Sequence, residues 1–271
     1  MQQFTATAVQ IRAANERLAT FAEASKAVEL AARSGSALVA LPELFFWRGT
    51  AAEERVGAET IPGPTSDFAA ALAKRLGIHL VAGSLLERVD DEDRCFNTAL
   101  LFAPDGTLLA RYRKIHLFDV EVAGEVSAHE SRTRQPGSET VTVMTALGCI
   151  GLAICYDLRF PELFRRLADA GAEIVVMPSA FTKPTGRAHW HALVRARAIE
   201  NQCYFIAPNR YGPTQHGFDD YGHSLIVDPW GEVLAEGPED RPELVSASLD
   251  PARLDHVRAG LPSLEHRRLR P

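Results

Sequence analysis

Hydrophobic and polar residues follow two periodicities along this chain, one typical of helices and one typical of strands. Apolar residues at helical spacing predict helices over 15–33, 65–76, 161–170 and 188–202, and a short helix from Pro251. Thr65 or Ser66 is expected to cap the second helix, and Gly77 lies just beyond its end. Apolar runs and alternating stretches predict strands near 1–10, 37–41, 78–85, 96–103, 108–114, 150–154, 172–180, 204–209, 222–228, 233–236 and 244–249. The segment 119–137 has no period and is rich in Glu, Gly and Ser, so we expect a long loop there.

This succession of strands and helices predicts the α/β class, and strands that are apolar on both faces imply buried sheets. A chain of 271 residues can bury a large core. Because the sequence shows no internal repeat and no low-complexity linker, we expect a single domain over 1–271. Periodicity alone does not count the layers of such a fold.

Composition narrows the classes of function. The net charge of −6 argues against non-specific nucleic-acid binding. No apolar run is long enough to span a bilayer, and no charged-then-apolar leader follows Met1. We therefore expect a cytoplasmic protein that has neither a membrane partner nor a nucleic-acid partner.

Cysteine and histidine spacing predicts neither a metal site nor a cofactor. The four cysteines lack the paired spacing of zinc or disulfide frameworks, and burial is the better account of Cys95, Cys149 and Cys203. His189 and His191 are two residues apart on a predicted helix, a spacing that points them to different faces. No Gly-x-Ser-x-Gly, Walker or dinucleotide pattern is present, so no cofactor is expected.

Cys155 lies where a predicted buried strand, 150–154, gives way to a predicted helix. Pro161 suits the first turn of that helix because its missing N–H would have no partner there. A side chain at such a corner is held rigidly, and a carbonyl beside it would meet backbone N–H groups at the helix start. The alternative is that Cys155 is a buried small hydrophobe, the commonest fate of a free cysteine. A local charge network is expected to fix this corner, formed by Asp157, Arg159 and Glu162.

Two other charged residues also end apolar segments. Glu43 follows the run 37–41 and precedes further apolar residues, and a carboxyl group in such surroundings tends to have a raised pKa unless a partner is near. After the hairpin turn at Asp105-Gly106, alternation places Lys114 on the inward face of its strand. A lysine that snorkels at a strand end is the other interpretation.

A thiol, a carboxylate and an ammonium at three strand ends form a covalent catalytic set if they converge. The thiol of Cys155 attacks an acyl carbon, while the carboxylate of Glu43 removes the thiol proton and later activates water. The ammonium of Lys114 stabilises the oxyanion and helps to keep the thiolate charged.

The same residues lie in stretches that resemble the nitrilase superfamily of carbon-nitrogen hydrolases. The Glu, Lys and Cys blocks of that superfamily match, in the same order, Leu41-Pro42-Glu43, Arg113-Lys114-Ile115-His116-Leu117 and Cys155-Tyr156-Asp157-Leu158-Arg159-Phe160-Pro161-Glu162. The stretches 188–202 and 221–231 are also similar, so the likeness runs from about residue 5 to the end. The second glutamate of the superfamily matches Glu130, and the resemblance implies a positioning and electrostatic role for it.

The resemblance also implies a fold and an assembly. It implies a four-layer α-β-β-α sandwich whose monomers pair through helices into a homodimer or a higher homo-oligomer. The helix after Cys155 and the helix from Ala188 would then form the interface.

The implied reaction is hydrolysis of a linear, small-molecule amide with release of ammonia and without a cofactor. Cys155 would attack the amide carbon, Glu43 would act as base and then as acid, and Lys114 with the N–H of Tyr156 would hold the oxyanion. The likeness is greatest to the branch of amidases that act on deaminated glutathione and on 2-oxo acid amides, and the stretch 179–186 leans toward the former.

Substrates of that branch carry carboxylates, so we expect cations near the pocket. The candidates lie in loops after Glu43 or after the strand 172–180, and they are Arg48, Lys183 and Arg187. Phe181 and Thr185 in the second of these loops are candidate substrate contacts. The other interpretation of these residues is that they lie on the surface and bind no substrate. Arg159 is a secondary candidate for substrate binding.

Several other functions would use much of the same sequence. Omega-amidase activity on 2-oxoglutaramate or 2-oxosuccinamate is the main alternative, followed by a nitrilase and an N-carbamoyl amino-acid hydrolase. A non-catalytic scaffold would have no need for a lysine-paired thiol. A redox sensor built on Cys155 ranks low because no resolving cysteine is evident nearby.

Overall fold

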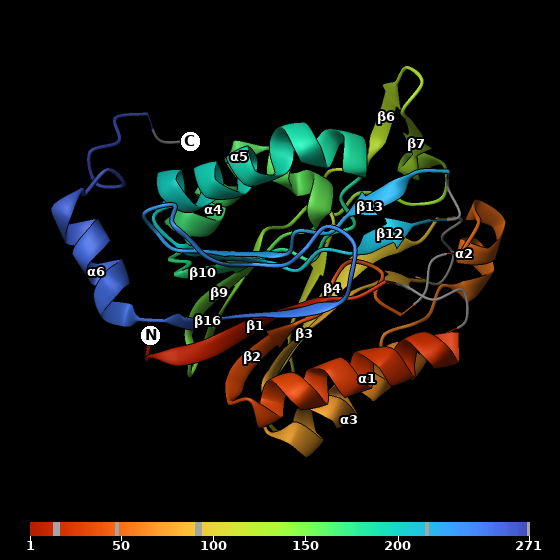
Figure 1. Ribbon diagram of the computed structural model, residues 1–271, viewed down its shortest axis with the longest axis horizontal. Coiled ribbons are helices and arrows are strands. Elements are labelled where there is room, and N and C mark those ends of the chain that lie inside the picture. The colour runs from red at the N-terminus through yellow and green to blue at the C-terminus, as the bar shows by residue number, and fades with distance from the viewer. Residues whose placement is uncertain (13–16, 47–48, 90–93, 215–216, 270–271) are drawn as a thin grey trace.

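Two six-stranded sheets pack face to face, and helices cover the outer face of each, so the molecule has four layers in the order α-β-β-α (Figure 1). The computed structural model describes residues 1–12, 17–46, 49–89, 94–214 and 217–269. This architecture confirms the α/β class and the four-layer sandwich that the resemblance implied.

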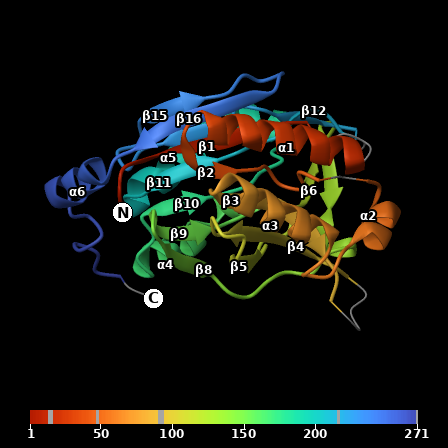
Figure 2. The same cartoon turned by 90° about the horizontal axis from the view of Figure 1, so that it is seen from below.

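The first sheet has the strand order β16-β1-β2-β3-β4-β5. Its strands are β1 (Phe4–Gln10), β2 (Ser36–Ala40), β3 (His79–Glu87), β4 (Phe96–Phe102), β5 (Leu108–Arg113) and β16 (Glu243–Leu249). β1, β2 and β3 are parallel, and the other pairings are antiparallel. Parallel neighbours need a crossover connection, which α1 (Arg17–Arg33) and α3 (Pro64–Leu76) supply. These two helices lie side by side on the outer face of the sheet (Figure 2).

The second sheet has the strand order β15-β14-β11-β10-β9-β8. Its strands are β8 (Val141–Thr145), β9 (Gly148–Leu152), β10 (Ile174–Val176), β11 (Tyr204–Ala207), β14 (Leu225–Val227) and β15 (Val233–Glu236). β9, β10 and β11 are parallel, and the helices α4 (Pro161–Asp169) and α5 (Lys183–Asn201) connect them across the outer face (Figure 1). The chain continues beyond β16 into α6 (Pro251–Gly260).

Apolar side chains fill the space between the sheets and the spaces beneath the helices on both outer faces. Leu38 from the first sheet and Ile150 and Ile206 from the second belong to one buried cluster. Val28 of α1 and Leu72 of α3 belong to the other. Both faces of the central strands are therefore covered, which explains why their sequences are apolar without interruption.

The sequence placed most of these elements but erred at several boundaries. The cap predicted at Thr65 or Ser66 was wrong, because α3 begins at Pro64 with Gly63 as its N-cap. Gly77 does end the helix, in the left-handed conformation that glycine adopts readily. The predicted strand 172–180 is shortened to β10, and α5 begins five residues before its predicted start. Pro184 in the first turn of α5 is favourable there, and the sequence prediction had not used it.

The long loop predicted over 119–137 was also wrong in part. A hairpin of β6 (Asp119–Val122) and β7 (Val126–His129) occupies its first half, followed by the short 3₁₀ helix η1 (Glu130–Arg132). Most side chains of this hairpin are exposed or half-buried, so no apolar face marked its strands in the sequence. Four further short elements were not predicted, namely α2 (Ala51–Gly57), β8, β12 (Tyr211–Pro213) and β13 (Asp219–Tyr221).

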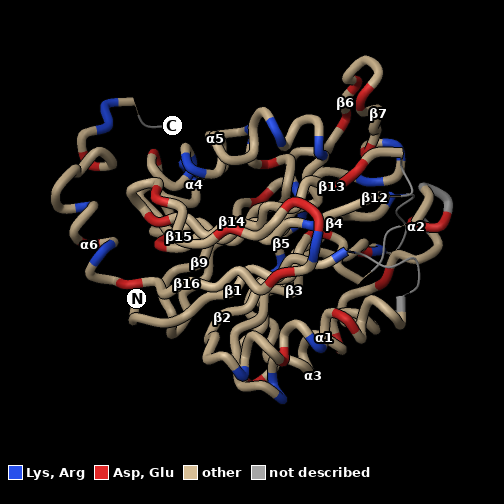
Figure 3. Tube along the Cα trace, viewed as in Figure 1, with Lys and Arg blue, Asp and Glu red and all other residues tan. Residues whose placement is uncertain are grey.

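Charged residues of both signs are spread over the two outer helical layers (Figure 3). The interior of the sandwich, by contrast, is dominated by apolar side chains. Among the described helices, none is both long enough and apolar enough to cross a membrane.

Candidate active site

Four of the residues singled out in the sequence meet in one pocket at the ends of strands from both sheets. Glu43 follows β2, Lys114 follows β5, Cys155 follows β9, and Glu130 begins η1. All four line the same pocket. Segments far apart in the sequence thus bring a carboxylate, an ammonium and a thiol together.

A tight backbone arrangement positions Glu43. The next residue, Leu44, has a positive φ of 47° and donates its N–H to Oγ of Ser84 at 3.0 Å. Gly83 in β3 also has a positive φ, and a Cβ there would lie 2.0 Å from the carbonyl oxygen of Pro42. Only glycine allows β3 to pass this close to the segment that carries Glu43.

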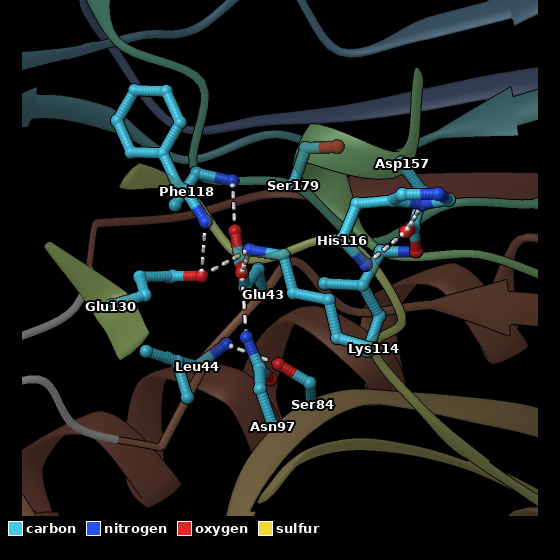
Figure 4. Close-up of polar contacts among 12 residues, drawn as sticks. Glu43, Leu44, Ser84, Asn97, Lys114, His116, Phe118, Glu130, Asp157 and Ser179 are labelled. Carbon is cyan, nitrogen blue, oxygen red and sulfur yellow. Dashed lines mark hydrogen bonds and ion pairs between the residues drawn. The ribbon is translucent and has the colours of Figure 1, made fainter. Parts of the chain in front are cut away.

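The Glu43 carboxylate is buried and fully engaged in hydrogen bonds. Its Oε1 accepts from Nδ2 of Asn97 at 2.7 Å and from Nζ of Lys114 at 3.0 Å (Figure 4). Its Oε2 accepts from the backbone N–H of Ala180 at 3.0 Å. These donors fix the orientation of the carboxylate and balance its charge in a site where only 3% of the residue is exposed.

Lys114 lies between two carboxylates. Its Nζ donates to Glu43 at 3.0 Å and to Oε2 of Glu130 at 2.9 Å (Figure 4). Burial alone would lower the pKa of the ammonium, but the two neighbouring negative charges outweigh burial and hold this pKa above its ordinary value. The inward position predicted from alternation is therefore that of a buried, charged lysine.

Glu130 is held by cations on two sides and by backbone. Its carboxylate accepts from Lys114, from Arg134 and from the backbone N–H of Phe118. Burial raises its pKa, but the charges of Lys114 and Arg134 outweigh burial and lower the pKa to about 2. Arg134 is itself buried and pairs with Glu54 at 2.7 Å, so it links Glu130 to α2.

A buried carboxylate, Asp157, fixes the corner that carries Cys155. Cys155 begins the 3₁₀ helix η2 (Cys155–Arg159), with a positive φ of 46°. Asp157 accepts hydrogen bonds from the N–H of Ile154 at 2.9 Å and from the hydroxyl of Tyr112 at 2.7 Å. It also contacts His116, whose backbone N–H lies 3.1 Å away and whose Nδ1 lies 2.7 Å away (Figure 4).

The charge network predicted at this corner is thus only partly correct. Asp157 is the anchor, but its described partners are Tyr112 and His116 rather than Arg159 or Glu162. Nη1 of Arg159 instead lies 3.3 Å from Nδ1 of His189. Asp157 points into the core, toward β5. Its partners there come from a distant part of the chain, so the sequence pattern around Asp157 could not identify them.

Lys114 lowers the pKa of the Cys155 thiol, as expected of a group that helps to keep the thiolate charged, but other influences outweigh it. Burial and the nearby charge of Glu43 raise the pKa of this thiol well above its ordinary value, although Lys114 acts in the opposite direction. Glu43 also interacts with the thiol as a hydrogen-bond partner. At neutral pH the group is a neutral thiol beside a carboxylate that can take its proton.

The remaining candidates divide into those that line the pocket and those that do not. Tyr156, Phe181 and Thr185 line it. Lys183 is not among the described lining residues, and its Nζ lies 2.5 Å from Glu239. Arg48 lies outside the described residues. Both Lys183 and Thr185 belong to the first turn of α5 rather than to a loop as predicted.

Several residues of the site were missed by the sequence reading. Asn97 contacts Glu43 from within β4, and a buried amide in an otherwise apolar strand is a signal that could have been used. Arg134 has no such signal, because its partners are set by tertiary structure. Further pocket-lining side chains were also not predicted, and they are Leu44, Phe118, Ala180, Thr182 and Phe218.

Comparisons with known proteins agree with this geometry. A family model described as carbon-nitrogen hydrolase matches residues 5–259. Deaminated glutathione amidase of Synechocystis sp. is 41% identical over 98% of this chain and 99% of its own length. Omega-amidase NIT2 of Homo sapiens is 37% identical over 99% of this chain and 96% of its own length.

A solved structure shows the same fold. The crystal structure of Nit3 of Saccharomyces cerevisiae, described as a member of branch 10 of the nitrilase superfamily, matches with a TM-score of 0.89 and 34% identity. The match covers 99% of this chain and 97% of that one. The expected resemblance is therefore confirmed along nearly the whole chain. The chain belongs to the carbon-nitrogen hydrolase family of the nitrilase superfamily, whose members are hydrolases that act on carbon-nitrogen bonds.

Proposed function

We propose that this protein is an amidase that hydrolyses a linear amide through a Cys155 thioester and releases ammonia, with deaminated glutathione as its substrate. One observation carries the proposal. The Cys155 thiol, the Glu43 carboxylate and the Lys114 ammonium share a single buried pocket, with the carboxylate in contact with both other groups.

Acylation begins with the neutral thiol. Glu43 takes the proton from Sγ of Cys155 as the sulfur bonds to the amide carbon, because the raised pKa of the thiol leaves little thiolate without a base. The carbonyl oxygen becomes an oxyanion, which Nζ of Lys114 and the N–H of Tyr156 stabilise. The Tyr156 N–H belongs to the first turn of η2, where N–H groups have no partner within the helix. Glu43 then gives its proton to the nitrogen, the carbon-nitrogen bond breaks, and ammonia leaves.

Deacylation uses the same carboxylate. Glu43 removes a proton from water, and the water oxygen bonds to the thioester carbon. The carbon-sulfur bond breaks, the carboxylic acid product leaves, and the proton returns from Glu43 to the sulfur. Glu130 holds Lys114 in place during both steps and acts as a positioning residue.

The candidate amide substrates carry a carboxylate, which requires a cation near the pocket. Lys183 is paired with Glu239, so it is a weaker candidate than the sequence indicated. The guanidinium of Arg159 lies 5.2 Å from the ring centre of Phe181 and 5.6 Å from that of Tyr156. Since both rings line the pocket, Arg159 is the cation that we assign to the substrate carboxylate.

Omega-amidase activity on 2-oxoglutaramate is the second candidate. The likeness to omega-amidase NIT2 of Homo sapiens favours it, at 37% identity over nearly the whole chain. Such a substrate also presents a carboxylate, so Arg159 would serve in either case. The length of the substrate between its amide and its carboxylate distinguishes the two.

An ammonia assay tests the proposal. Purified protein is incubated with deaminated glutathione and with 2-oxoglutaramate, and ammonia release is measured for each. We expect turnover of both, with the higher kcat/KM for deaminated glutathione. Cys155→Ala should release no ammonia, whereas Cys149→Ala, which removes a buried thiol of β9, should retain activity. If the unmodified protein releases no ammonia from either substrate, the proposal is contradicted. A higher kcat/KM for 2-oxoglutaramate would favour the second candidate.

A further inference from the structure

Three side chains with metal-binding atoms meet beside α5, and none of them lines the pocket. His191 lies in α5, His223 follows β13, and Glu236 ends β15. One such atom from each lies within 4.8 Å of the others. Nε2 of His191 and Nδ1 of His223 approach the same oxygen, Oε1 of Glu236, at 2.9 and 2.6 Å.

We propose that His191, His223 and Glu236 bind a divalent transition-metal ion, with Zn²⁺ as the preferred ion and water as the fourth ligand. Two imidazole nitrogens and one carboxylate oxygen form a known ligand set of open zinc sites. Imidazole favours zinc over Mg²⁺ and Ca²⁺, which prefer sets of oxygen atoms. The expectation of no metal site rested on the spacing of His191 from His189, whereas the partners of His191 come from other segments of the chain.

Hydrogen bonds to the backbone of His223 fix the position of this residue relative to His191. His223 has a positive φ of 52°, and its N–H donates to the carbonyl of Pro238 at 3.1 Å. Its own carbonyl accepts from Nε1 of Trp190 at 2.7 Å. Because Trp190 directly precedes His191 in α5, the same turn of helix fixes His223 and carries the second imidazole.

Two glycines permit the close approach of the segments that meet here. A Cβ on Gly186 of α5 would lie 2.4 Å from the ring of Tyr221. A Cβ on Gly222 would lie 2.3 Å from the carbonyl oxygen of Glu239. With glycine at both positions, His223 and the end of β15 can lie against α5.

Carboxylate oxygens lie on both sides of the His223 ring. Oε1 of Glu236 lies 2.6 Å from Nδ1 of this ring. Oε2 of Glu239 lies 3.9 Å from Nε2 of His223, the ring nitrogen that points away from the cluster. At this distance Glu239 makes no hydrogen bond to the ring, and its Oε1 pairs with Lys183 and Arg187, so the proposed ligands are His191, His223 and Glu236 alone.

The cluster is open to solvent. The side chains of His191, His223 and Glu236 are 36%, 21% and 38% exposed. A hydrated ion can therefore enter without opening the fold. Once bound, it would join α5 to β15 and β13, and α5 begins with the turn that supplies Thr185 to the pocket.

Metal titration of the full-length chain, purified without a histidine tag, tests the proposal. A Cys155→Ala background removes the pocket thiol as a competing soft ligand. After treatment with a chelator, Zn²⁺ binding is measured by calorimetry and Co²⁺ binding by its visible absorption. We expect one ion per chain. His191→Gln and Glu236→Gln should each weaken binding by more than about tenfold, because each removes one ligand atom from the ion.

His256→Gln is the matched control, because His256 is an exposed histidine on α6 outside the cluster. It should bind Zn²⁺ as the parent does, and Zn²⁺ should raise the Tm of both but not of His191→Gln. His191→Gln removes one hydrogen bond at a half-exposed position, so it decides the test even if Glu236→Gln fails to fold. Absence of binding, or binding that survives His191→Gln, would overturn the proposal and leave two histidines that are each hydrogen-bonded to Glu236. Neither result depends on the amidase substrate.

Discussion

We propose that Glu43 acts on Cys155 both as a base and as a negative charge, and one substitution separates the two roles. Glu43→Gln removes the base, so ammonia release should fall by about 100- to 10,000-fold. The same change removes a charge that raises the pKa of the Cys155 thiol, while Lys114, which lowers that pKa, remains. We therefore expect the pH midpoint for alkylation of Cys155 by iodoacetamide to fall in the variant. Mass spectrometry of the alkylated peptide over a pH series measures this midpoint.

A Cys149→Ala background serves as the control for this experiment, because it removes another thiol that precedes Cys155 by six residues. An alkylation midpoint that stays constant or rises in Glu43→Gln would show that the charge of Glu43 does not act on the thiol. Loss of turnover with a lowered midpoint is the combination that assigns both roles to one carboxylate.

Glu130 contributes to stability in a pH window that its lowered pKa defines. Its folded-state pKa is about 2, below the ordinary value of 4.5. A carboxyl group with a depressed folded-state pKa stabilises the fold above its unfolded-state pKa, and this contribution is lost as the pH falls toward the folded value. Glu130→Gln should therefore lower the free energy of unfolding at pH 7 by roughly 3 kcal/mol. Urea unfolding at a series of pH values measures the difference.

The difference between Glu130→Gln and the unmodified protein should shrink as the pH falls from about 4.5 to about 2. A difference that does not change with pH would mean that packing, rather than the pairing with Lys114 and Arg134, accounts for the loss. Turnover should also fall, because Lys114 loses one of its two carboxylate partners.

At the residue scale, the sequence predicted the groups with reactive chemistry better than the groups that support them. Cys155, Glu43 and Lys114 each end an apolar segment, and that position is visible in a single sequence. Asn97 and Arg134 act through partners that only the tertiary structure supplies. The net rise in the pKa of Cys155 was not predicted for the same reason, because burial and the charge of Glu43 depend on neighbours that are distant in the chain.

At the scale of elements, the bend in β3 at Gly83 connects packing with function. Gly83→Ala would place a Cβ 2.0 Å from the carbonyl oxygen of Pro42, one residue before Glu43. The backbone must shift to relieve this contact, so we expect both the free energy of unfolding and kcat to fall. The stability loss should exceed the roughly 1–2 kcal/mol that a left-handed conformation costs a non-glycine residue. Thermal unfolding and the ammonia assay measure the two effects.

Gly77→Ala provides the comparison for Gly83→Ala. Gly77 also has a positive φ, but a Cβ there would meet no atom within 4 Å. This variant should therefore lose about 1–2 kcal/mol and keep its kcat. Equal effects of the two substitutions would show that the contact with Pro42 does not position Glu43.

The elements that the sequence predicted well are the long and strongly patterned ones. The helix α4 and the strand β16 agree with their predictions to within a residue, because each buries one continuous face. The hairpin β6–β7 has strands of four residues and partly exposed side chains, so its pattern was too weak to detect. The start of α5 was missed because Pro184 and Gly186 resemble a loop, although both have structural roles in the helix.

At the scale of the whole molecule, periodicity indicated buried sheets but not their number. A buried strand has apolar residues on both faces, whether a face packs against a helix or against another sheet. Its sequence therefore does not distinguish the two kinds of layer. The four layers were expected only from the resemblance, and the structure confirms them. The pocket arises from this layering, since Glu43 and Lys114 come from one sheet and Cys155 from the other.

Oligomerisation is the remaining expectation at this scale, and we propose that a second copy of the chain packs on α4 and α5. Ile199 on α5 is 44% exposed, and Trp230, beside the Gly231 that faces it, is 56% exposed. Two large apolar side chains in one outer layer would lose contact with water in a dimer. Ile199→Glu should convert the dimer into monomer, because it would bury an unpaired charge in the interface. Sedimentation velocity measures the mass of each species.

Leu18→Glu is the control, since Leu18 is 82% exposed on α1 in the opposite outer layer. A dimer through α4 and α5 should tolerate this change, because the Ile199 contact stays intact. If the unmodified protein sediments as a monomer, or if Leu18→Glu dissociates it instead, the interface does not lie on α4 and α5. Because α5 also carries Thr185 in its first turn, dissociation by Ile199→Glu should raise KM for the amide more than it lowers kcat.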